Sequence, residues 1–150
     1  MSGGWVDEPV SGDRAAMSIE SASRSAKALP FEYAALRVVP RVDRGEFVTG
    51  AVLLYCRDAG FLGIRVRPDL TCVRALWPPA DVEGIEGALA DAAAVAEGRA
   101  GGGIGSADPG SRFRWLTAPR SVVVQPGPVH TGVTGDPVAE LDRIAERMLG

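Results

Sequence analysis

Apolar and polar positions predict three neighbouring strands near the start of the folded region. Residues 33–40 alternate in part, residues 46–56 form a long apolar run, and residues 61–67 alternate regularly. Short turns separate them, and Asp43-Arg44-Gly45 suits a hairpin because glycine accepts the positive φ of a tight turn. We therefore predict a three-stranded antiparallel meander that buries one face. The other face should carry Arg37, Arg65 and Arg67.

Later segments carry apolar residues at helical spacing, and each begins with an aspartate that can cap a helix. Asp69 precedes a short helix that Pro78-Pro79 ends. Asp81 precedes a second helix, which ends near Gly98. The third aspartate, Asp136, is followed by proline, which is favourable at the first position of a helix. The apolar faces of the two longer helices are Val82, Ile85, Leu89 and Ala92 in one and Val138, Leu141, Ile144 and Met148 in the other.

The segment before the last helix contains many glycines and then a run of valines. Residues 98–111 are predicted to be a flexible loop, since GGGIGSADPG lacks the preceding strand, the following helix and the lysine of a phosphate-binding loop. Val122, Val123 and Val124 are consecutive β-branched residues, which are typical of a central strand buried on both faces. Two tryptophans, Trp77 and Trp115, are predicted to lie in the core.

The order of elements is strand, strand, strand, helix, helix, strand, helix. We predict an α+β domain in which an antiparallel sheet, made of the three-strand meander plus a later central strand, has helices packed on one face. A single domain of this kind should span residues 31–150. Residues 1–30 have neither a strand period nor a helix period, so we predict a disordered N-terminal tail that is dispensable for stability.

The composition restricts the class of protein. The chain has 46% hydrophobic and 23% charged residues, which is ordinary for a soluble globular domain. No apolar run approaches the roughly 20 residues of a membrane helix, and the N-terminus has no signal-peptide pattern. We therefore expect a cytoplasmic protein without a membrane partner. Two cysteines and one histidine are too few for a disulfide framework or a structural zinc site, and we expect no cofactor.

Arginines without acidic neighbours form the main candidate site. Residues 112–130 hold three arginines and no acid, whereas residues 69–108 hold seven acids and two arginines. A guanidinium binds phosphate or carboxylate groups in a bidentate manner, and an imidazole titrates near neutral pH. We predict an anion- or partner-binding surface, unless acids from the helices pair with these arginines. Its candidate residues are Arg37, Arg41, Arg112, Arg114, Arg120, Gln125 and His130.

Two long sequence blocks resemble a known family. They are YAALRVVPRVDRGEFVTGAVLLYC and FRWLTAPRSVVVQPGPVHTG, followed by a closing D-P-x-x-E-L-D-R helix. Together they resemble the DUF3037 family, an uncharacterised bacterial domain common in actinobacteria, over residues 33–149. Thr49 stands where this family usually has asparagine, in E-F-V-N-V-G. Members are often encoded beside a HipA-like Ser/Thr kinase, so the resemblance implies a kinase-associated partner or regulator, and it supplies no catalytic residues.

Two functions from different classes follow from these observations. The first is a non-enzymatic interaction or regulatory module that acts with a partner protein such as a HipA-like kinase, because the charges are segregated and no catalytic signature is found. The second is a small enzyme or binding protein for a phosphate- or carboxylate-bearing small molecule, which would use the arginines with Gln125 and His130. Nucleic acid is not an expected partner, because the net charge is −3.

Overall fold

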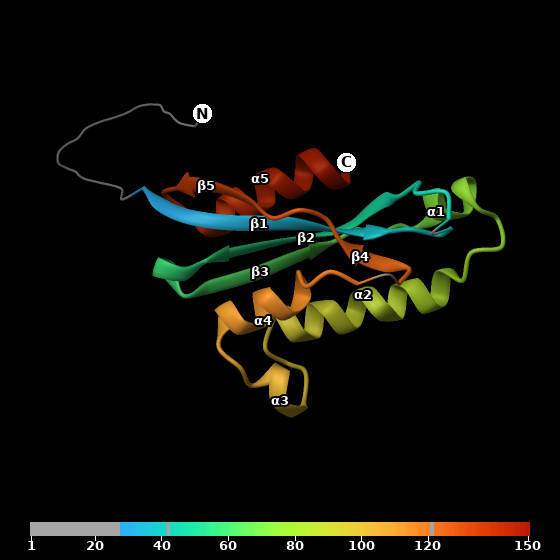
Figure 1. The fold of residues 1–150 in the computed structure, drawn as a ribbon. Helices are drawn as coiled ribbons and strands as arrows, with labels where there is room; N and C mark the ends of the chain where they lie inside the picture. The colour runs from blue at the N-terminus through green and yellow to red at the C-terminus, as the bar shows by residue number, and fades with distance from the viewer. Residues whose placement is uncertain (1–27, 42, 121) are drawn as a thin grey trace.

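The computed structural model describes residues 28–41, 43–120 and 122–150. In this part of the chain, one antiparallel sheet lies between helices on both of its faces (Figure 1). The predicted α+β class is confirmed. Most of the predicted N-terminal tail lies outside the described residues. Its last two residues, Leu29 and Pro30, belong to the first strand, which therefore begins before residue 31.

The predicted meander is confirmed. β1 (Leu29–Val38), β2 (Val48–Cys56) and β3 (Phe61–Val66) pair antiparallel in sequence order. A 3-10 turn, Arg57–Ala59, connects the last two strands and is closed by Gly60 with a φ of 60°. Glycine adopts this left-handed conformation without steric cost, so Gly60 explains why the chain turns here.

Two short strands extend the sheet beyond β1. β4 (Val124–Pro126) and β5 (His130–Thr134) pair with opposite ends of β1 and form the sheet edge far from β3 (Figure 1). The predicted central strand is therefore wrong. Val122 and Val123 precede β4 and are 52% and 41% exposed. Pro126 explains the edge position, because a proline has no N–H to offer a further strand.

In the described residues, four helices lie on one face of the sheet: α1 (Thr71–Leu76), α2 (Val82–Ala96), α3 (Gly102–Gly105) and α4 (Pro109–Leu116). Their apolar side chains share one core with alternate residues of the meander. Its largest fully buried members include Leu53, Leu89 and Phe113. Asp81 caps α2 as predicted, because its side chain accepts a hydrogen bond from the Gly84 N–H at 3.0 Å.

The predicted flexible loop at residues 98–111 is wrong, since it contains α3 and the start of α4. Asp108 accepts a hydrogen bond from the Ser111 N–H at 2.8 Å, and Pro109 occupies the first helical position. The surrounding glycines obscured this helix start in the sequence. α4 continues to Leu116, so Arg112 to Leu116 are helical rather than part of a strand.

The opposite face of the sheet is covered by α5 (Pro137–Leu149), which Asp136 caps as predicted (Figure 1). The predicted packing on one face thus describes α1 to α4, and α5 adds a cover on the other face. The long apolar run of β2 requires this cover, because alternate residues of the run point to each face. The second core contains Val52, Leu54, Cys56, Leu141 and Ile144. None of the helices in the described ranges combines the length and the apolar character that crossing a bilayer requires.

Candidate functional site

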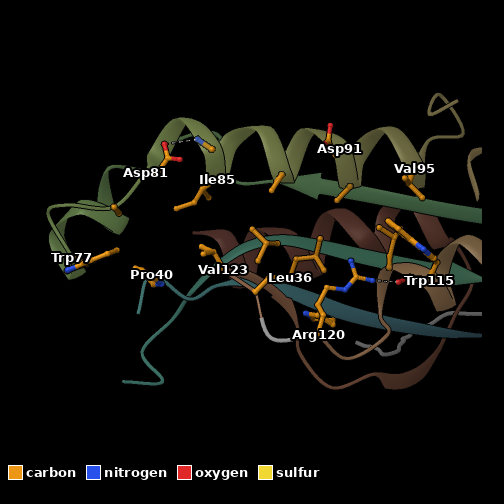
Figure 2. A pocket seen from close by; sticks show the side chains of 18 residues that line it. Leu36, Pro40, Trp77, Asp81, Ile85, Asp91, Val95, Trp115, Arg120 and Val123 are labelled. Carbon is orange, nitrogen blue, oxygen red and sulfur yellow. Dashed lines mark hydrogen bonds between the residues drawn. The ribbon is translucent and has the colours of Figure 1, made fainter. Parts of the chain in front are cut away.

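An apolar groove lies between α2 and the chain that leads into β4 (Figure 2). It encloses about 550 Å³, a volume typical of binding pockets. Two buried residues, Leu36 of β1 and Leu116 of α4, contribute to its lining. Trp77 also lines it and packs against the first core, which agrees with its predicted position.

One wall of the groove is a single face of α2. The sequence positions of Ile85, Ala88, Ala92 and Val95 differ by three, four and three, so these residues lie on one side of the helix. In Figure 2, Ile85 and Val95 point from α2 towards the strands. The middle of this face consists of two alanines, whose small side chains leave space beside the helix. The sequence of α2 therefore produces the hollow.

The opposite wall consists of Trp115, at the end of α4, and the valines before β4. Trp115 is 44% exposed, Val122 52% and Val123 41%, which is a large apolar exposure for one groove. The predicted core position of Trp115 is wrong. Phe113 and Leu116 point inward from α4, and Trp115 falls outside their face of the helix.

Arg120 supplies a positive charge at the groove. Its Nε donates to the carbonyl of Ala118 at 3.3 Å, and its Nη2 donates to the carbonyl of Trp115. The guanidinium carbon lies 4.9 Å from the centre of the Trp115 ring, which is a cation–π contact (Figure 2). These contacts hold the guanidinium beside the apolar wall. Asp81 and Asp91 line the α2 side, where the Asp81 carboxylate caps the helix and the Asp91 side chain points away from the strands (Figure 2).

Three of the predicted arginines have partners within the domain. Arg112 donates from Nη1 to the carbonyls of the last two residues of α2, at 3.1 and 2.9 Å, and so closes the C-terminus of that helix. Arg114 lies 2.7 Å from Glu32, and Arg41 lies 3.0 Å from Asp43. The hydrogen bond from Arg41 lowers the pKa of Asp43. Of these three arginines, Arg114 gains an acidic partner from a distant part of the sequence, whereas Arg112 is held by backbone carbonyls.

The remaining predicted residues lie on the sheet face opposite the groove. Gln125 pairs in register with Arg37, and His130 pairs with Tyr33, with 5.1 Å between their ring centres. The strand neighbours of Arg37 and Gln125 line the groove, so alternation directs these two side chains towards the α5 side. The predicted single surface is thus divided by the sheet. Arg120 lies at the groove, and Arg37, Gln125 and His130 lie behind it.

Sequence reasoning missed the groove because its residues have the composition of a core. Ile85 and Ala92 were predicted on the apolar face of a helix, and Val123 in a buried strand. The available signal was Pro126, because a proline in a strand indicates a sheet edge. The valine run lies at the edge of the sheet. Its apolar side chains therefore have no further strand beside them and remain exposed.

Fold and groove together define a small α+β domain with an apolar cleft on one side of its antiparallel sheet. A family model described as "Protein of unknown function (DUF3037)" matches residues 33–149, and the chain belongs to this family. The resemblance carried by the two sequence blocks is thereby confirmed. No curated protein and no solved structure matches the chain.

Proposed function

We propose that this domain is a non-enzymatic interaction module that acts in the cytoplasm and binds an apolar helix of a partner protein in the α2 groove. The observation that carries the proposal is the exposed wall formed by Trp115, Val122 and Val123, each more than 40% exposed. Soluble domains rarely leave such side chains together at the surface unless they bind something there.

The form of the groove favours a helix as the occupant. Its α2 wall runs from Ile85 to Val95, which corresponds to about 15 Å along the helix axis. An amphipathic partner helix could place anchors at positions i, i+3 or i+4, and i+7 along this distance. Ala88 and Ala92 allow a second helix to approach closely. Arg120 favours a partner carboxylate next to the apolar anchors, because its guanidinium already faces the groove wall.

The candidate partner is a HipA-like Ser/Thr kinase. Its support is the membership of a family whose members are often encoded beside such kinases, together with a groove that suits a protein segment. In this proposal the groove binds an apolar helix of the kinase. Binding of that helix in the groove regulates the kinase.

Calorimetric titration of the purified chain with a purified HipA-like kinase from the same organism tests this proposal. Val122→Asp places a charge in the groove wall and should weaken binding at least about tenfold, as loss of a central anchor does. Val138→Asp is the matched control, because Val138 is 47% exposed on α5, on the other side of the sheet. Equal affinity of both variants and the unchanged chain would exclude the groove. Absence of binding by the unchanged chain would exclude the kinase.

A further inference from the structure

A row of polar side chains crosses the sheet on the face opposite the groove. Arg37 of β1 pairs in register with Thr49 of β2 on one side and with Gln125 of β4 on the other. Paired residues of neighbouring antiparallel strands lie about 4.5–5.5 Å apart and point to the same face. A guanidinium, a hydroxyl and an amide therefore lie side by side, and all three residues are half-buried.

The guanidinium of Arg37 is held on two sides. Its Cζ lies 4.2 Å from the centre of the Phe47 ring. A Cβ atom at Gly127 would lie 3.0 Å from its Nε and 3.2 Å from its Cζ, so the group packs against the glycine backbone. The ring and the glycine thus fix the plane of the guanidinium. Within the described residues, no acidic side chain forms an ion pair with Arg37.

A second guanidinium reaches the same row. Arg67 follows β3, and its Nε donates to the Thr49 carbonyl oxygen at 2.7 Å. Two arginines therefore approach Thr49 from neighbouring strands. Both arginines are half-buried, and removal from water disfavours a charge that has no counter-charge.

Acids in the vicinity are engaged by other arginines. Asp43 pairs with Arg41 at 3.0 Å, and Glu46 pairs with Arg44 at 3.6 Å within the same turn. On the α5 side, Asp142 pairs with Arg65 at 2.8 Å. In the described part of the chain, the nearby carboxylates thus neutralise other guanidinium groups. Among the described residues, neither Arg37 nor Arg67 forms an ion pair with an acid.

We propose that Arg37, Arg67, Thr49 and Gln125 bind a phosphate group on this face of the sheet. Two guanidinium groups, a hydroxyl and an amide offer hydrogen-bond donors from several directions. A tetrahedral phosphate can accept from all of them, whereas a planar carboxylate is matched by one guanidinium. This site is independent of the groove, because the sheet separates the two.

An NMR titration of the full chain with inorganic phosphate at constant ionic strength tests the site. Saturable shifts are expected for the guanidinium N–H signals of Arg37 and for the Nη–H signals of Arg67, whose Nε–H already donates to the Thr49 carbonyl. Acetate titrated in the same way should not saturate them. Arg37→Lys keeps the charge but removes the bidentate geometry, and should weaken phosphate binding about tenfold or more. Arg44→Lys makes the same change at an exposed arginine of the neighbouring turn, and its phosphate affinity should equal that of the unchanged chain.

Two further variants keep the result interpretable. Gln125→Ala changes an edge-strand residue outside both cores, and should weaken phosphate binding while the thermal melt stays cooperative. Val122→Asp, which disrupts the groove, should leave phosphate binding unchanged. Shifts that rise linearly with phosphate, equal saturation by acetate, or unchanged affinity in Arg37→Lys would each overturn the proposal. None of these outcomes bears on the partner groove.

Discussion

Aspartate followed by proline begins two helices of this domain. Asp108 and Asp136 each accept hydrogen bonds from N–H groups in the first turn of the helix that follows. The proline at the next position has the φ of a helix and no N–H that needs a partner. Such starts depend on neighbouring residues alone, so they are readable from sequence. The helix after Asp108 was missed because nearby glycines outweighed this local signal.

Asp108 should make the stability of the domain depend on acid pH. Hydrogen bonds from the Ser111 N–H and hydroxyl lower the pKa of Asp108 below its ordinary value of 3.8. The ionised carboxylate therefore contributes stability that is complete above the unfolded-state pKa and is lost as pH falls through the lower folded-state pKa. Asp108→Asn keeps a capping side chain without the charge. Melting temperatures should favour the native chain at neutral pH and converge in strong acid, whereas a constant difference would contradict this account.

The partners of charged residues, in contrast, could not be predicted from local sequence. Arg114 pairs with Glu32, which is 82 positions away in the chain. Arg112 caps the C-terminus of α2 by donating to backbone carbonyls. Every residue has a backbone carbonyl, so the residue types in the sequence do not reveal this partner. The candidate site therefore separated into structural arginines and two groups on opposite faces only when the fold was known.

At the scale of elements, the meander followed from hydrophobic alternation and turn chemistry, whereas the position of the valine run did not. β-Branched residues favour extended backbone, but this preference does not distinguish a central strand from an edge. Whether the valine run has a strand on one side or on both depends on which strands pair with β1 on the side away from β2. Two short strands, β4 and β5, share that side, and Pro126 prevents further pairing in the first of them.

Two glycines of α2 should respond differently to alanine. Gly87 has no atom near the position of an added Cβ, so Gly87→Ala should stabilise the domain by about 0.5–1 kcal/mol through helix propensity. At Gly84 the added Cβ would collide with the Asp81 carboxylate that caps the helix. Loss of such a cap costs about 0.5–2 kcal/mol, so Gly84→Ala should be neutral or destabilising. Urea unfolding of the two variants checks this, and equal stabilisation by both would contradict the capping geometry.

At the scale of the whole molecule, the sheet separates two surfaces of different chemistry. The α2 side presents an apolar groove with Arg120 beside it, and the α5 side presents the polar row around Arg37. Both follow from the alternation of β1 and β4, which sends neighbouring residues to opposite faces. A partner helix and a phosphate group could therefore bind at the same time without competing for the same atoms.

Photo-cross-linking in the native host tests the central claim, that the groove binds a partner protein, most directly. A photoreactive amino acid is placed at Val122 on one wall, at Ala88 on the α2 wall, and at Val138 on α5 as the control. The account predicts that both groove positions cross-link to the same protein, that this protein is a HipA-like kinase, and that mass spectrometry maps both adducts to one apolar helix. Position 138 should give no such adduct. Absence of adducts at both groove positions, different proteins from the two walls, or equal yield at position 138 would contradict it.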